Sequence, residues 1–265
     1  MDAPTLVGAR AVAPDLIELA SYLPVPGFGL LPVNAFVLRG EETVLVDTGL
    51  AALAEPFLDL LESVVDPAEI RWIWLSHMDA DHLGNLRALL ERAPRAEIVT
   101  NFLGMGKLAL AGLPTARVRV LAPGERLALP DRTLVPLRPP YYDAPETMGF
   151  FDTRTRALFS ADAFGALMPE PAEEAAAISA ETLRAGMTTW SSIDAPWLAQ
   201  LDRGAFGRAL SALERLDPEI VLSGHLPSAR GITRDLLAHL AAAQASGPVD
   251  APDHDEIERL VAAHS

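Results

Sequence analysis

The sequence has no cysteine, few basic residues and no long apolar run. Without cysteine the chain can form no disulfide, zinc–thiolate site or iron–sulfur cluster, and this composition suits a reducing cytosol. With 21 Lys and Arg against 36 Asp and Glu, the net charge is −15, so no basic patch can bind nucleic acid or an anionic membrane. No apolar run is long enough to span a bilayer, and the first residues do not resemble a signal peptide. We therefore expect a cytoplasmic protein without nucleic-acid or membrane partners.

Size and element order predict the architecture. The chain has 265 residues, half of them hydrophobic, which is enough for one α/β domain with a sizeable core. A strand-rich stretch followed by helices occurs twice, and no linker divides the chain. This order predicts an αββα sandwich, in which two mixed β-sheets are covered by helices on the outside. We expect a single domain over residues 1–265, with a helical tail from about residue 248.

Hydrophobic alternation and turn residues divide the chain into short elements. The expected strands are Leu6–Val12, Leu16–Ala20, Asn34–Arg39, Thr43–Val46, Arg71–Leu75, Glu97–Thr100, Val118–Leu121, Thr133–Leu137, Met148–Asp152, Ala157–Ser160 and Glu219–Leu222. The expected helices are Leu53–Val64, Leu83–Arg92, Leu103–Ala111, Ala205–Leu216 and Thr233–Ala243. Met168–Ala180 is expected to be a loop that leads into a surface helix.

The segment from His77 to His82, His-Met-Asp-Ala-Asp-His, concentrates side chains that can bind metal. An apolar, strand-like run, Trp72–Leu75, precedes it, and an amphipathic helix follows. Imidazole and carboxylate groups at this density are typical of a site for first-row metals. Asp and His are also common turn and cap residues, but this alternative explains the density less well.

Other His and Asp side chains stand at or just beyond the ends of expected strands, namely Asp47, Asp162 and His225. Asp143, after a Pro-Pro pair, is a further candidate. Sites in layered α/β folds gather where loops converge at strand ends. Turn or cap roles are the alternative for Asp143, Asp162 and His225. For Asp47 we expect a hydrogen bond that braces a ligand, not direct ligation.

The ordered motifs resemble the metallo-β-lactamase superfamily over roughly Asn34 to His225. The resemblance rests on His-x-Asp-x-Asp-His, on Leu-Phe-Ser-Ala-Asp-Ala-Phe-Gly around Asp162, and on the late Ser-Gly-His. It is closest to the redox branch, the flavodiiron and oxygen-binding diiron proteins, because a carboxylate stands at Asp79 where the hydrolase branch has His. The chain departs from that family at Asp143, where the family has a His.

The resemblance implies two metal ions and their ligands. The implied ligands are His77, Asp79 and Asp143 for one ion, Asp81, His82 and His225 for the other, and Asp162 as a bridge between them. Because Asp reaches less far than His, the first position could be weaker, completed by water or empty. Carboxylates are hard ligands that favour iron and its ferric state, with manganese and zinc as alternatives.

The resemblance and the ligand chemistry predict a dinuclear, non-haem iron protein that binds or reduces dioxygen or a related small oxidant. About forty residues follow His225, too few for a flavodoxin-like domain, so we expect reduction to need an external electron-donor protein. The alternative is a metal-dependent hydrolase of an ester, lactone, thioester or phosphodiester, in which Asp81 would orient a metal-bound hydroxide. A degenerate site that no longer binds two metals is a third hypothesis, suggested only by Asp143. The Ala- and Leu-rich helices could pack in a homodimer.

Two further sets of residues lie outside the implied ligand set. We expect His239, His254 and His264 to be surface residues without partner ligands. Trp190, Trp197, Met187 and Phe164 could wall the site, but aromatic and Met side chains are more often plain core.

Overall fold

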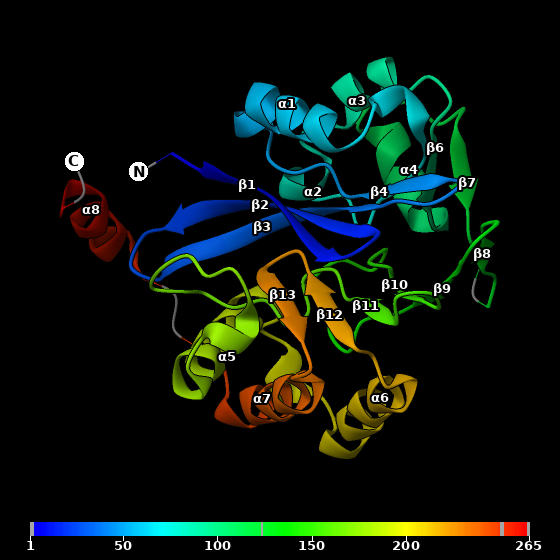
Figure 1. Cartoon of the computed structure of the whole chain (residues 1–265). Helices are drawn as coiled ribbons and strands as arrows, with labels where there is room; N and C mark the ends of the chain where they lie inside the picture. Colours follow the sequence, from blue (N-terminus) through cyan, green and yellow to red (C-terminus); the bar gives the residue numbers. More distant parts are fainter. Residues whose placement is uncertain (1–2, 123, 250–251, 264–265) are drawn as a thin grey trace.

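The computed structural model describes residues 3–122, 124–249 and 252–263 (Figure 1). The strands are β1 Thr5–Ala13, β2 Leu16–Val25, β3 Gly29–Leu38, β4 Thr43–Val46, β5 Ile70–Trp74, β6 Glu97–Thr100, β7 Val118–Val120, β8 Leu127–Ala128, β9 Thr133–Leu137, β10 Gly149–Asp152, β11 Ala157–Phe159, β12 Ile220–Ser223 and β13 Leu226–Arg230. The helices are α1 Ala54–Val64, α2 Ala80–Leu83, α3 Leu86–Arg92, α4 Phe102–Leu110, α5 Ala180–Asp194, α6 Arg203–Leu216, α7 Thr233–Ser246 and α8 His254–Ala263, with short 3-10 turns at Ala51–Leu53, Pro67–Glu69, Ala175–Ala177 and Leu198–Gln200.

The strands form two mixed sheets, as the sequence predicts. The first sheet has the order β1-β2-β3-β4-β5-β6-β7. Its pairs are antiparallel up to β4 and parallel from β4 to β7. The second sheet has the order β13-β12-β11-β10-β9-β8, and only β11 and β12 run parallel in it. Parallel neighbours end at the same edge of a sheet, which is why the loops after β4, β5, β11 and β12 can meet.

Side chains on one strand alternate between two apolar layers. On β5, Trp72 and Trp74 face the space between the sheets, whereas Ile73 packs under the outer helices. On β11, Phe159 faces the same central space, and Leu158 packs toward the opposite helical layer. This alternation has the period of two that a strand buried on both faces requires. Helices α1, α3 and α4 cover one face and α5, α6 and α7 the other (Figure 1), so the αββα sandwich is confirmed.

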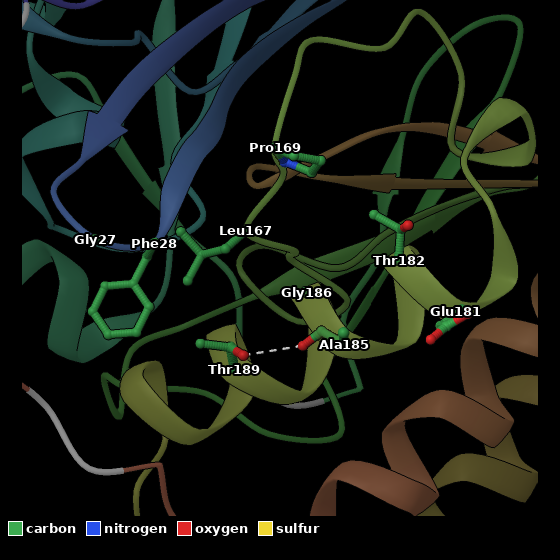
Figure 2. Close-up of a pocket in the computed structure, with 9 residues that line it drawn as sticks. All are labelled: Gly27, Phe28, Leu167, Pro169, Glu181, Thr182, Ala185, Gly186 and Thr189. Carbon is green, nitrogen blue, oxygen red and sulfur yellow. Dashed lines mark hydrogen bonds between the residues drawn. The ribbon is translucent and has the colours of Figure 1, made fainter.

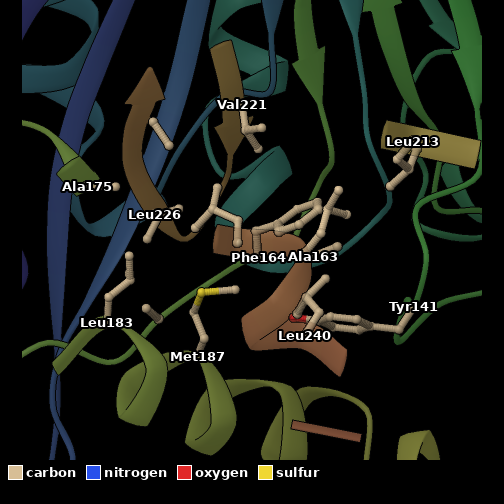
Figure 3. Close-up of a cluster of buried hydrophobic side chains, with 14 of the residues drawn as sticks. Tyr141, Ala163, Phe164, Ala175, Leu183, Met187, Leu213, Val221, Leu226 and Leu240 are labelled. Atoms are coloured by element: carbon tan, nitrogen blue, oxygen red, sulfur yellow. The ribbon is translucent and has the colours of Figure 1, made fainter. Parts of the chain in front are cut away.

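The layers are held by two kinds of apolar contact. Between the sheets, the rings of Trp74 and Phe150 meet edge to face with centroids 4.7 Å apart, a geometry that adds about 1 kcal/mol to burial alone. Beneath α5 and α7, Phe164 and Met187 are fully buried among aliphatic side chains (Figure 3). Phe164 and Met187 therefore serve as core. The shared central layer supports our proposal that residues 1–265 fold as one domain, with α8 as its tail.

Several elements differ from the sequence-based expectation. The hairpin of β2 and β3 is much longer than the two short strands predicted. Pro24 and Pro32 argue against regular strands, yet Pro32 pairs with Tyr22 in register. The expected helix Leu83–Arg92 begins only at Leu86. A Cβ at Gly84 would lie 2.3 Å from the carbonyl oxygen of Gly49, so the chain bends closely past that loop. Strands β8 and β13 were not predicted.

The prediction that three histidines lie on the surface is confirmed for only one of them. His254 is exposed on α8, as predicted. His239 is partly buried in α7, and its Nε2 has no hydrogen-bond partner among the described residues, so the surface assignment was wrong for it. His264 lies outside the described residues. Within the described ranges, no helix combines the length and apolarity that a membrane crossing requires.

Candidate metal centre

The loops after β4, β5, β11 and β12 bring their polar side chains together at one edge of the sandwich. Three residues there, Asp47, Ala161 and Phe164, have positive φ values of 58°, 51° and 70°. Non-glycine residues adopt this left-handed conformation at a cost of about 1–2 kcal/mol each. Backbone strain of this kind clusters at functional sites. The backbone is therefore strained at and beside Asp47 and Asp162, and this strain accompanies the particular placement of their side chains.

Three buried imidazoles meet at this edge in a common orientation. The outer ring nitrogen Nδ1 of each is held by the protein: His77 by Ser76 Oγ at 3.0 Å, His82 by Asp47 Oδ2 at 2.9 Å, and His225 by the carbonyl oxygen of Pro32 at 2.7 Å. Asp47 also accepts hydrogen bonds from the backbone N–H and the hydroxyl of Ser76, so it braces the site as expected. Histidines that bind metals through Nε2 show this pattern of outer-nitrogen contacts.

Asp162 lies between the inward-facing Nε2 atoms of these imidazoles. Its Oδ2 is 3.3 Å from Nε2 of His77, and its Oδ1 is 3.1 Å from Nε2 of His82 and 3.4 Å from Nε2 of His225. One oxygen thus faces one histidine and the other oxygen faces two. This is the placement that a carboxylate shared by two metal ions needs.

Asp81 completes a group on the side of His82 and His225. Its Oδ2 lies 3.6 Å from Nε2 of His82 and 3.5 Å from Nε2 of His225. The ligand atoms of these three residues lie within 4.8 Å of one another, as they can around a single ion. We name this group the inner position.

A second group lies on the other side of Asp162. His77, Asp79 and Asp143 also place ligand atoms within 4.8 Å of one another, with Asp143 Oδ1 4.0 Å from Nε2 of His77. His77 is fully buried, whereas Asp79 and Asp143 are exposed. We name this group, which has a single imidazole, the outer position. The structure therefore brings all seven expected ligands together.

Unsatisfied polar atoms show that these residues fit metal ions. Among the described residues, Nε2 of His77, Nε2 of His82 and Oδ1 of Asp162 are buried without a hydrogen-bond partner. A buried polar atom without a partner costs several kcal/mol, and native structures rarely keep such atoms without a reason. The atoms converge on one another from two segments, one after β5 and one after β11, so cations between them would satisfy all three.

Comparison with known families agrees with this geometry. A family model described as ODP family beta lactamase matches residues 31–225. The chain belongs to this family. It is a member of the metallo-β-lactamase superfamily in its redox branch, as the carboxylate at Asp79 predicts.

Curated relatives of this ODP-family chain are longer flavoproteins. It is 31% identical over 185 residues to the type A flavoprotein fprA of Rhodobacter capsulatus. The aligned region covers 62% of this chain and 40% of the relative. It is 32% identical over 134 residues to the putative diflavin flavoprotein A 3 of a Nostoc species, which covers 50% of this chain and 23% of the relative. The chain thus spans less than half the length of either relative.

Solved structures share the fold. Rubredoxin oxygen:oxidoreductase from Desulfovibrio gigas superposes with a TM-score of 0.78 at 22% identity, over 91% of this chain and 62% of that chain. The flavodiiron protein from Giardia intestinalis superposes with a TM-score of 0.79 at 17% identity, over 91% and 60% of the two chains. At these identities the likeness concerns the fold.

The electrostatics of the ODP-family site show how it is balanced without a metal. Burial alone lowers the pKa of His225, but Asp162 and Asp81 raise it to about 9. Burial likewise lowers the pKa of His82, and neighbouring carboxylates raise it well above its ordinary value. Burial raises the pKa of Asp162, yet the surrounding imidazoles hold it well below the usual range. The protons on these histidines thus supply positive charge beside the carboxylates, and a metal ion would displace them.

Asp194, the last residue of α5, is a site residue that the sequence reasoning missed. Its carboxylate lies with those of Asp143 and Asp162, with one oxygen of each within 4.8 Å of the others. Burial and the charge of Asp162 raise the pKa of Asp194 to about 8. The only available sequence signal is the tripeptide Asp-Ala-Pro, which begins with Asp143 and again with Asp194. The same tripeptide also starts at residues 2 and 250, so it is not specific.

Trp190 closes one side of the centre. Its ring lies 4.7 Å from that of His225, and its Nε1 donates a hydrogen bond to the carbonyl oxygen of Asp162. A Cβ at Gly165 would lie 2.4 Å from the indole, so only glycine permits this approach. Trp190 therefore walls the site. Trp197 stacks edge to face on Tyr142, with ring centroids 5.7 Å apart.

A separate hollow beside α5 lacks this chemistry. It encloses about 450 Å³ (Figure 2). The lining residues are Gly27, Phe28, Leu167, Pro169, Glu181, Thr182, Ala185, Gly186 and Thr189. A single carboxylate and no imidazole line it, so it cannot assemble a comparable ligand set. The strand-end cluster is the candidate functional site.

Proposed function

We propose that this chain binds two metal ions, iron in its native form, and uses them to bind or reduce dioxygen or a related small oxidant. The observation that carries the proposal is the position of Asp162 between His77 on one side and His82 and His225 on the other. A carboxylate so placed can be shared by two cations, and dinuclear sites keep their metals about 3.5–4 Å apart.

The ligand set favours iron. His77, Asp79 and Asp143 would hold the outer ion, Asp81, His82 and His225 the inner ion, and Asp162 both. Four negative carboxylates balance the four positive charges of two divalent ions. They also stabilise a higher oxidation state, whereas a site richer in imidazole suits zinc. Bound iron would supply the one-electron redox chemistry that no side chain here can perform.

The protein residues around the ligands have supporting roles. Asp47, Ser76 and the Pro32 carbonyl fix the tautomers and the ring planes of the three histidines, which keeps each Nε2 free to coordinate. Trp190 and Gly165 pack closely over His225 and exclude water from that side. The exposed side of Asp79 and Asp143 leaves a route by which a small oxidant can enter.

The names of the relatives agree with a redox role. A curated relative is a type A flavoprotein, and one structural neighbour is a rubredoxin oxygen:oxidoreductase. We infer that an electron donor outside residues 1–265 supplies the electrons, either a separate protein or a further domain. The hydrolytic alternative has no specific support in the geometry and enters as an outcome of the test.

The test is a metal analysis followed by an oxygen reaction. The protein would be purified without added metal, and its iron, zinc and manganese content measured. It would then be reduced without oxygen, and its absorption spectrum recorded before and after exposure to oxygen. We expect two irons per chain and a band that appears only with oxygen. Zinc occupancy, no response to oxygen and turnover of a generic ester would overturn the proposal in favour of a hydrolase.

A further inference from the structure

Asp194 occupies an unfavourable place for a carboxylate. It ends α5, where the helix macrodipole presents its negative end, which repels an anion. Its Oδ2 atom is buried without a hydrogen-bond partner among the described residues. The charged groups that influence it most are Asp162, Asp143 and two histidines of the site, and neither Arg nor Lys is among them. Burial, like charges and the helix end all oppose this carboxylate, so its position calls for a cation.

The neighbouring atoms show where that cation would bind. Asp194, Asp143 and Asp162 each place a carboxylate oxygen within 4.8 Å of the others. Asp162 is 4% exposed and His77 is fully buried. Nε2 of His77 has no hydrogen-bond partner among the described residues and lies 4.0 Å from Oδ1 of Asp143, one of these three carboxylates. A buried, unpartnered imidazole nitrogen thus lies beside the carboxylate group to which Asp194 belongs.

The outer position also has a deficit that Asp194 could fill. It has one imidazole, and its other two residues are exposed. Asp143 Oδ1 stands 4.0 Å from Nε2 of His77. A carboxylate side chain is shorter than an imidazole, so a second carboxylate from another element can make up for that shorter reach. Asp194 comes from α5, whereas Asp79 comes from the segment after β5.

We propose that Asp194 is a further ligand of the metal ion at the outer position, beside His77, Asp79, Asp143 and Asp162. The outer ion is then held mainly by carboxylates, and the inner ion by two imidazoles and Asp81. This inference rests on the proposed dinuclear function, because it assigns one more ligand to one of its two ions.

Metal titration tests the assignment directly. Chelator-treated, metal-free protein would be titrated with Mn²⁺, and unbound Mn²⁺ counted by electron paramagnetic resonance. We expect the native chain to bind two ions. Asp194→Asn keeps the size of the side chain but removes its charge, and should weaken the lower-affinity ion by about 10- to 100-fold while the tighter ion is unchanged. Asp59→Asn, at an exposed position on α1, is the matched control and should bind like the native chain.

A second pair of variants tests whether Asp194 makes up for Asp143. In an Asp143→His background an imidazole supplies the longer reach, so a further Asp194→Asn change should cost less than about threefold in affinity. Thermal melting of every metal-free variant checks that it folds.

The outcomes separate the two proposals. If the native chain binds two ions and Asp194→Asn binds both as tightly, only the role of Asp194 is overturned. An equal loss in the native and Asp143→His backgrounds would show that Asp194 does not substitute for the missing imidazole. If the native chain binds fewer than two ions, the dinuclear function itself fails.

Discussion

The inner and outer positions share Asp162, and each has buried imidazole, but they differ in the number of imidazoles and in the exposure of their other residues. The inner position has His82 and His225, both buried, each with its outer nitrogen held by the protein. The outer position has one imidazole and two exposed carboxylates. Buried, preoriented imidazoles bind tightly because little has to be ordered when the metal arrives. If two ions bind as proposed, we expect the inner ion to be retained and the outer ion to face the small molecule.

The largest expected effect removes the feature that the two positions share. Asp162→Asn should weaken Mn²⁺ binding at both positions by at least about 100-fold, because both lose a charged bridging ligand. Metal content after purification measures the effect, with Asp59→Asn as the control. Loss of only one ion would show that Asp162 belongs to one position and does not bridge.

The next variants separate the positions. His225→Gln should weaken one ion by about 100-fold, whereas Asp143→Ala should weaken the other by about tenfold, because Asp143 is exposed and one of several carboxylates there. Equilibrium titration of both variants with Mn²⁺ compares the two losses. His254→Gln, on exposed α8, is the control for the histidine change. Equal losses would contradict the ranking of the two positions.

Acidity should act mainly on the inner position. His225 has a pKa of about 9 in the metal-free protein, so a metal ion must displace its proton at neutral pH. Affinity for Mn²⁺ should therefore rise about tenfold per pH unit between pH 6 and pH 8 for each proton displaced.

The stability of the metal-free fold should change in the opposite direction as the pH rises. Protonated His225 stabilises that fold fully below about pH 6.5, by about 3 kcal/mol, and this contribution disappears as the pH rises through 9. A melting temperature of the metal-free protein that does not fall as the pH rises over this range would contradict the charge balance inferred for the site.

The smallest expected effect concerns the choice of metal. Asp79→His adds an imidazole to the outer position, and should shift its preference from iron toward zinc by about tenfold. Competition between Fe²⁺ and Zn²⁺ under anaerobic conditions, followed by metal analysis, measures the preference. An unchanged ratio would show that Asp79 does not set metal choice.

Local patterns in the sequence sufficed for part of this centre. The segment His77–His82 and the strand that precedes it are contiguous, so their chemistry is visible without a fold. The continuous apolar runs of β4, β5 and β11 likewise predict strands buried on both faces. Asp143, Asp162 and His225 were candidates from their positions in the chain, but their assignment as ligands needed the resemblance to a known family, because each stands alone in its own stretch of chain.

Other features depend on tertiary packing and leave no local signal. Asp194 reaches the site only because α5 packs on α7 and ends beside Asp162. The carbonyl of Pro32 orients His225, but a backbone atom carries no sequence signature. Pro32 also lies inside β3, and because proline is unfavourable inside strands the sequence predicted too short a β2–β3 hairpin. Contacts across long stretches of chain therefore account for most of what the sequence did not predict.

The hydrogen bond between Pro32 and His225 joins the two halves of the sandwich, and it has a consequence for synthesis. The residues from His77 to His82 leave the ribosome roughly 150 positions before His225, which at roughly 5–20 residues per second is an interval of roughly 7–30 s. During that interval the nascent chain offers a solvent-exposed chelator without its bridging Asp162 or its last imidazole. Metals that are abundant in the cell can sample it, but none can be retained in a closed centre. Under the proposed function, the selection of iron would therefore be a property of the finished fold and would take place after translation.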